Sequence, residues 1–185
     1  MNETLKVSII PIRDIPKSIM KSISDGIKEV YSPVVREVKV ASKFELPSEA
    51  YNPNRDQYRA EIILQRLSSR YSSKEGKILA ITTEDLYSEG LNFIFGQAQK
   101  PGKFALISLH RLRPEFWEDE KDRRRFLTRA VKEAIHELGH TFGLEHCESL
   151  SCVMTFSNRI GHTDRKDAKF CEKCKKKIKR LYQEG

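Results

Sequence analysis

The sequence lacks long apolar runs. Its first residues, MNETLKVSIIPIRDIPK, reach charged side chains after only a few apolar ones. A membrane-spanning helix needs about 20 predominantly apolar residues, and a secretory signal needs an apolar core of about 7–15. Neither segment is predicted, so we expect a cytoplasmic protein with no membrane partner.

Internal repeats and low-complexity linkers are also absent. The 185 residues fit one domain that can bury enough surface to be stable without disulfides. Hydrophobic residues make up 38% of the chain and charged residues 32%, the balance of a globular protein with a densely charged surface. We expect a single catalytic domain over residues 1–185, and a monomer.

Outside the last part of the chain, positive charge barely exceeds negative charge. The net charge is +8, and residues 165–180 contain nine Lys/Arg and two Asp/Glu, which gives 9 − 2 = +7 for that segment. One interpretation is a solvated amphipathic helix over about residues 172–183, with Phe170, Ile178 and Leu181 packed inward and lysines outward. The other is a surface that binds nucleic acid or an acidic protein. We favour the first.

The order of elements predicts an α/β or α+β fold. Apolar and β-branched patterns predict strands over residues 5–12, 34–41, 77–82, 93–95 and 104–109. Helical spacing predicts helices over residues 19–30, 55–71 and 118–142, followed by an irregular segment rich in cysteine and histidine. We expect a mixed sheet with helices packed against it.

One helical motif carries the chemistry, His136-Glu-Leu-Gly-His140-Thr-Phe-Gly143-Leu-Glu-His146. Residues four apart lie one above the other on a helix, so His136 and His140 can offer two nitrogens to one zinc ion at about 2.0–2.1 Å. Glu137 lies roughly 100° round the axis, where it can reach a water on the ion. Gly143 permits a left-handed turn that ends the helix and brings His146 in as the third ligand.

The histidine side of this helix is predicted to face a cleft. The apolar stripe on a helical wheel consists of Leu127, Val131, Ala134, Leu138 and Phe142. The histidines point to nearly the opposite side, which they share with Arg129, Lys132 and Glu133.

Three neutral imidazoles leave zinc an open fourth position for water, whose pKa falls toward about 7 in such sites. Glu137 is then the candidate general base, because a carboxylate there can take the water proton and pass it to the leaving amine. The motif therefore predicts hydrolysis of an amide bond without a covalent enzyme intermediate.

Four cysteines form a second candidate site, in two close pairs: Cys147 with Cys152, and Cys171 with Cys174. Disulfides are rare in a reducing compartment, and four thiolates in two pairs match a closed tetrahedral zinc site. Such a site has no water to activate, so its role is to fold residues 147–174. Since Cys147 follows His146, we expect this structural zinc to anchor the third catalytic ligand.

With Met154 shortly after it, the HELGHTFGLEH run resembles the metzincin signature of zinc metallopeptidases. The spacing of the four cysteines and Met154 is similar to that of the archaemetzincins. The resemblance implies a compact domain with a twisted mixed sheet, a catalytic and a structural zinc, and a methionine turn below the catalytic zinc.

The resemblance also implies a cleft whose edge strand aligns a peptide substrate, and residues 104–109 are the candidate strand. Tyr87, Asn92, Phe156 and Asn158 are candidate cleft residues. We therefore expect a zinc metallopeptidase acting on a peptide or small protein. The alternative is a zinc-stabilised module that binds nucleic acid or an acidic protein surface, but it leaves Glu137 without a role.

Overall fold

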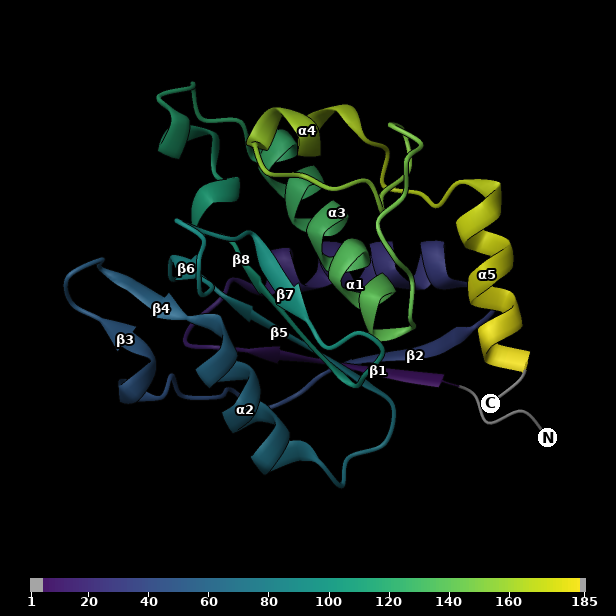
Figure 1. The fold of residues 1–185 in the computed structure, drawn as a ribbon, viewed down its shortest axis with the longest axis horizontal. Helices are drawn as coiled ribbons and strands as arrows, with labels where there is room; N and C mark the ends of the chain where they lie inside the picture. Colours follow the sequence, from purple (N-terminus) through teal and green to yellow (C-terminus); the bar gives the residue numbers. More distant parts are fainter. Residues whose placement is uncertain (1–4, 184–185) are drawn as a thin grey trace.

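A computed structural model describes residues 5–183 of the chain, with side chains described for residues 5–180. Its main sheet has five strands in the order β2-β1-β5-β8-β7 (Figure 1). All neighbours run parallel except β7, which is antiparallel to β8. The strands are β1 (Leu5–Pro11), β2 (Val35–Val40), β5 (Lys77–Thr82), β7 (Gly96–Ala98) and β8 (Phe104–Ser108).

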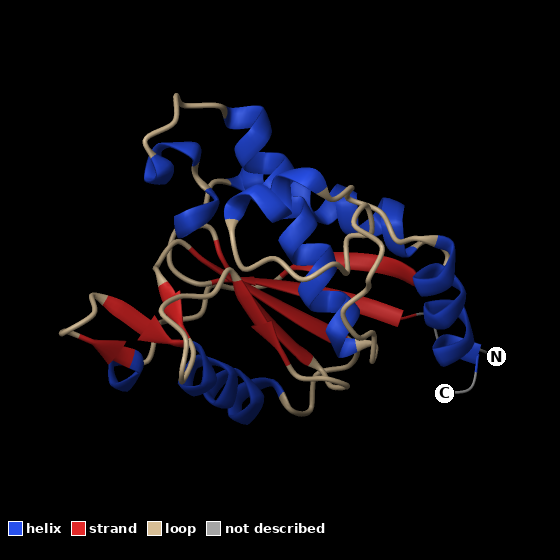
Figure 2. Cartoon of the chain, turned by 45° about the horizontal axis from the view of Figure 1, so that its top comes forward, coloured by secondary structure: helices blue, strands red, loops and turns tan. Residues whose placement is uncertain are grey.

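Helices cover both faces of this sheet (Figure 2). On one face lie α1 (Lys17–Tyr31) and α3 (Arg123–Thr141), and on the other lies α2 (Ala60–Tyr71). Neighbouring residues of β5 point to opposite faces, so Leu79 packs into the α1/α3 core and Ile78 into the α2 core. Because both faces are covered, β5 and β8 are apolar almost throughout, as central parallel strands are.

Smaller elements surround this frame. A second sheet joins β3 (Tyr51–Asn52), β4 (Gln57–Arg59) and β6 (Leu86–Tyr87) in the order β3-β4-β6. The 3₁₀ helices are η1 (Ser48–Ala50), η2 (His110–Leu112) and η3 (Pro114–Trp117). The short helix α4 (Ile160–Arg165) follows the loop after α3, and α5 (Glu172–Gln183) ends the described chain.

The predicted fold class is confirmed, whereas several predicted boundaries were wrong. Residues 55–71 divide into β4 and α2, so the helix begins only at Ala60. The helix expected from residue 118 begins at Arg123, because the Asp122 carboxylate accepts a hydrogen bond from the Arg125 backbone N–H at 2.9 Å and caps it. Residues 93–95 contribute only a single bridge at Ile94, and the strand follows at β7.

The C-terminal helix lies where the charge pattern placed it. Ile178 is buried and Phe170 is half-buried against Tyr31, as predicted for the inward face, while the Leu181 side chain lies outside the described residues. Within residues 5–183, no helix combines the length and apolar character that crossing a membrane requires.

Candidate metal centre and cleft

The three motif histidines meet at the end of α3. His136 and His140 lie one turn apart with their Nε2 atoms 3.1 Å from each other. The helix ends at Thr141, and Gly143 adopts a φ of +87° that turns the chain back. This turn brings His146 to the other two, so that one ring nitrogen of each histidine lies within 4.8 Å of the others.

Backbone carbonyls fix which nitrogens are free. His136 Nδ1 lies 2.8 Å from the Val153 carbonyl oxygen, and His140 Nδ1 lies 2.8 Å from that of Leu144. A carbonyl only accepts, so each Nδ1 carries the proton and each Nε2 presents a lone pair. Two lone pairs facing each other at 3.1 Å repel unless a cation lies between them. Zinc–nitrogen bonds of about 2.05 Å at a tetrahedral angle place two nitrogens about 3.3 Å apart, so the site fits zinc.

The protonation of the three rings also suits a metal. Burial lowers the pKa of His136 well below its usual value, and the nearby Lys166 charge lowers it further. Burial likewise lowers the pKa of His140 and of the more exposed His146. The rings therefore stay neutral at neutral pH, the form that binds a metal.

Glu137 lies in a narrow space between α3 and the edge strand. A Cβ placed on Gly96 of β7 would lie 2.6 Å from Glu137 Cγ and 2.8 Å from the Leu106 carbonyl oxygen. Only glycine therefore lets β7 pass this close to the carboxylate. Burial raises the pKa of Glu137 well above its usual value, and the negative charge of Glu133 raises it further.

A cleft of about 550 Å³ opens over these residues. One wall is β7 with the loop before it, and the other is formed by α3, His146 and residues 156–158. Of the candidate cleft residues, Asn92, Phe156 and Asn158 line it. Tyr87 instead lies under the Arg55 guanidinium, 4.3 Å from the ring centroid, and accepts a hydrogen bond from Asn52.

The edge strand predicted at residues 104–109 was wrong. β8 lies between β5 and β7, and β7 is the strand that ends the sheet beside the cleft. All five side chains of β8 are buried, as in a strand with neighbours on both sides. β7 is a short strand, and its Gly-Gln-Ala sequence lacks the apolar pattern that predicts strands.

The four cysteines also come together. Their Sγ atoms lie within 4.8 Å of one another, the Cys147 and Cys171 sulfurs are 3.7 Å apart, and no disulfide joins them. Burial raises the pKa of Cys171, but hydrogen bonds from the Cys174 backbone and from the neighbouring thiols outweigh it and lower that pKa to about 7. Burial raises the pKa of Cys152 and of Cys174. Four converging sulfurs fit a tetrahedral zinc.

Met154 lies directly below α3. A Cβ on Gly139 would overlap the Met154 sulfur, so the helix and the methionine turn approach as closely as glycine permits. The Cys147 backbone N–H donates to the Met154 carbonyl at 3.0 Å, which ties this turn to the cysteine cluster. Met154 is fully buried and packs in the core, as the motif predicted.

The polar side of α3 faces the cleft only in part. Glu133 lines the cleft together with the histidines, whereas Arg129 and Lys132 are buried beneath α4. The Arg129 guanidinium binds both oxygens of Asp164 at 2.7 Å, and Lys132 donates to the Thr163 and Asp164 carbonyls. The wheel located the polar side correctly but could not show that α4 covers part of it.

Two residues of this region carried no signal in the sequence. Lys166 is fully buried, with its Nζ 3.2 Å from Glu133 Oε1, 3.4 Å from the Thr155 carbonyl and 3.5 Å from His136 Nδ1. Gly96 is the other. Neither belongs to a motif, and both matter only through tertiary contacts.

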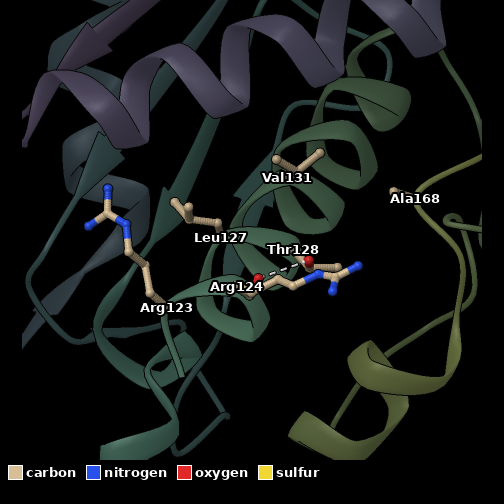
Figure 3. Close-up of a pocket in the computed structure, with 6 residues that line it drawn as sticks. All are labelled: Arg123, Arg124, Leu127, Thr128, Val131 and Ala168. Carbon is tan, nitrogen blue, oxygen red and sulfur yellow. Dashed lines mark hydrogen bonds between the residues drawn. The ribbon is translucent and has the colours of Figure 1, made fainter. Parts of the chain in front are cut away.

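A second hollow lies on the side of α3 that faces α1 and Ala168 (Figure 3). Its walls are mainly apolar and include Leu127 and Val131, while Arg123 and Arg124 lie at its margin. None of its side chains is a usual zinc ligand. The candidate chemistry therefore belongs to the histidine cleft.

A short edge strand beside a histidine-bearing helix, with a methionine turn beneath that helix, is the architecture of the metzincin class of zinc metallopeptidases. Peptidase family M54 matches residues 3–180 of the chain. The archaemetzincin of Methanocaldococcus jannaschii is 41% identical over 174 residues, which cover 94% of this chain and 93% of that protein. The archaemetzincin of Pyrococcus furiosus is 41% identical over 182 residues, covering 97% and 95%.

A solved structure gives the same relationship. The crystal structure of archaemetzincin from Methanopyrus kandleri is similar with a TM-score of 0.85 and 37% identity, covering 97% of this chain and 96% of that one. The chain belongs to the archaemetzincins, peptidase family M54, and is a zinc metallopeptidase.

Proposed function

We propose that the chain hydrolyses peptide bonds with zinc held by His136, His140 and His146 and with Glu137 as the general base. The observation that carries this proposal is the pair of deprotonated Nε2 atoms 3.1 Å apart beside a buried carboxylate in an open cleft. Zinc in such a site supplies a Lewis acid that makes water more acidic and polarises the carbonyl.

The chain's own residues transfer the proton, orient the histidines and align the peptide. Glu137 takes the proton from the attacking water and gives it to the leaving amine. The carbonyls of Val153 and Leu144 hold His136 and His140 in the tautomer and orientation that ligation requires. A peptide can lie along β7 as an additional strand, because β7 ends the sheet at the cleft.

Replacing Glu137 by Ala tests the base. The zinc ligands remain, so we expect zinc content and fold to be unchanged while cleavage of a peptide library falls by at least about 10²-fold. The measurement is a mass-spectrometric digest that compares both proteins after metal analysis. Unchanged turnover by Glu137→Ala would remove this residue from the mechanism.

We also propose a second, structural zinc on Cys147, Cys152, Cys171 and Cys174. The convergence of four unpaired thiols supports it, and it also supports a reducing compartment such as the cytoplasm. Metal analysis should give two zinc ions per wild-type chain. His140→Ala should lose the catalytic ion alone. Cys174→Ser should lose the structural ion and also weaken the catalytic one, because Cys147 adjoins His146. One zinc per wild-type chain would contradict the two-site proposal.

Residues 1–185 are proposed to act as one catalytic domain, since both apolar cores pack against the same sheet. The alternative function, a zinc-stabilised binding module, draws support from the exposed basic side of α5. It gives no reason for an acid next to the three histidines. Binding of nucleic acid by a protein that cleaves no peptide would favour it.

A further inference from the structure

The exposed side of α5 is predominantly basic. Among residues 172–180, Cys174 and Ile178 are buried, while every Lys and Arg is exposed. These side chains form what we call the basic face of α5: Lys173, Lys175, Lys176, Lys177, Lys179 and Arg180. On a helix with 100° between residues they fan out over the side opposite the two buried positions.

These charges form no close ion pairs among the described residues. Within the described part of the chain, no ion pair or side-chain hydrogen bond involves any residue of the basic face. Glu172 is the only acidic residue on α5 up to residue 180. By contrast, α1 pairs Lys21 with Asp25 on its own surface. Six like charges on one helical face repel one another, so an anionic partner would relieve a cost that the isolated protein carries.

The basic face is connected to the cleft. Cys174 of α5 belongs to the cluster with Cys147, which directly follows His146. Glu145, the residue before His146, is paired with Lys100, and Lys100 lines the cleft. In Figure 1, α5 lies next to the loop that follows α3. The cysteine cluster and the neighbouring Glu145–Lys100 pair therefore connect α5 to the margin of the cleft.

We propose that the basic face of α5 binds acidic residues of the peptide or protein substrate, to one side of the bond that is cut. The inference rests on the proposed function and names a substrate class for it. Charge complementarity supports an acidic segment as the occupant, and the cysteine cluster holds α5 to the segment that follows His146 beside the cleft. Because these charges are exposed to solvent, their attraction for an acidic segment acts over a long range and is screened by salt.

The test compares two triple variants with the same change in net charge. The first is Lys176→Glu, Lys177→Glu and Arg180→Glu on the basic face. The matched control is Lys17→Glu, Lys121→Glu and Arg124→Glu, three exposed cations at the beginnings of α1 and α3, away from α5. The substrates are peptides that share one cleavable segment. One carries an acidic extension and the other a glutamine-rich extension, and each extension is tested on the N-terminal and on the C-terminal side of the segment.

With wild type, the acidic extension on one side should raise kcat/KM. The α5 variant should lose about ten-fold for that peptide at low salt and little for the glutamine-rich one. About 0.5 M salt should remove the difference between the peptides. The control variant should behave like wild type. Zinc content and thermal unfolding check the fold, and Lys176→Gln, Lys177→Gln and Arg180→Gln serve as a milder version.

Binding is measured separately, by fluorescence anisotropy of the acidic peptide with zinc-loaded Glu137→Ala protein. Failure of wild type to cleave any peptide would refute the proposed function, while this arm would still report on α5. The inference is overturned if the acidic extension gives no gain in binding or cleavage. It is also overturned if both triple variants lose equally, or if the α5 variant loses only affinity for nucleic acid.

Discussion

At Gly96 the edge strand passes directly over the Glu137 side chain, with no space for a methyl group. Three features of Glu137 come from different parts of the chain: its position on α3, its burial beneath β7, and the Glu133 charge that raises its pKa. Residues outside the His-Glu motif, Gly96 and Glu133, therefore set the position and the pKa of the proposed base.

Gly96→Ala should lower activity by about 10–100-fold with zinc retained, because the new methyl group must displace either the carboxylate or the strand by a fraction of an ångström to an ångström. Peptide-cleavage kinetics together with metal analysis measure it. Gly161→Ala is the matched control, since a Cβ there meets no atom within 4 Å. Equal activity of Gly96→Ala and wild type would show that the Glu137 position tolerates this contact.

Individual site residues could be predicted from the sequence wherever a single helix sets the distances between them. His136 and His140 were predictable because helical periodicity places residues four apart on one side. His146 followed from the Gly143 turn. Gly96 and Lys166 were not predictable, since their importance depends on which strand ends the sheet and which segment covers α3.

Among the elements, α3 makes two different kinds of contact through its polar side. Its last two turns carry His136, Glu137 and His140 to the cleft. Its middle turns hold α4 through Arg129, Lys132 and Glu133. These contacts make α4 a cover for the helix and hold Lys166 beside His136.

Arg129→Met should lower the free energy of unfolding by about 2–4 kcal/mol, because it removes the buried member of the charge pair with Asp164 and a hydrogen bond to the Leu112 carbonyl. Urea unfolding monitored by circular dichroism measures it. Arg125→Met on the same helix is the control: its pairs with Asp119 and Asp122 are more exposed, so the expected loss is under about 1 kcal/mol. Similar losses for the two variants would mean that the Arg129 pair contributes no more to the free energy of unfolding than an exposed ion pair does.

The type of each element was predicted better than its neighbours in the folded structure. Residues 77–82 and 172–183 match β5 and α5 because a continuous apolar run and an amphipathic charge pattern are strong local signals. β7 was missed because it has three residues and no apolar alternation. Strand order depends on long-range packing, and a local pattern does not encode it.

For the whole molecule, the metal site links stability to pH. Burial lowers the pKa of His136, His140 and His146 in the folded chain, whereas unfolded histidine titrates near pH 6.5. As the pH falls below about 6.5, the unfolded chain takes up protons that the folded chain does not. The stability that these rings contribute is thus present above that pH and is lost as the pH falls toward their folded pKa values.

Metal-free protein should therefore become less stable between about pH 7 and pH 5.5, and zinc-loaded protein should be more stable throughout that range because the metal competes with protons for the same nitrogens. Urea unfolding at several pH values, with and without a chelator, measures both. The variant with all three histidines replaced by Ala should show a shallower decline. An equally steep decline in that variant would assign the effect to other groups.

The link between His146 and the cysteine cluster has a consequence for how the protein is made. Synthesis proceeds from the N-terminus, so a growing chain presents the HELGHTFGLEH run before Cys171 and Cys174 have left the ribosome. Under the two-metal proposal, the third histidine is held firmly only after those two cysteines have emerged. A chain still lacking them would thus carry the complete catalytic motif with a weakened zinc site, and the emergence of Cys171 and Cys174 would raise its activity.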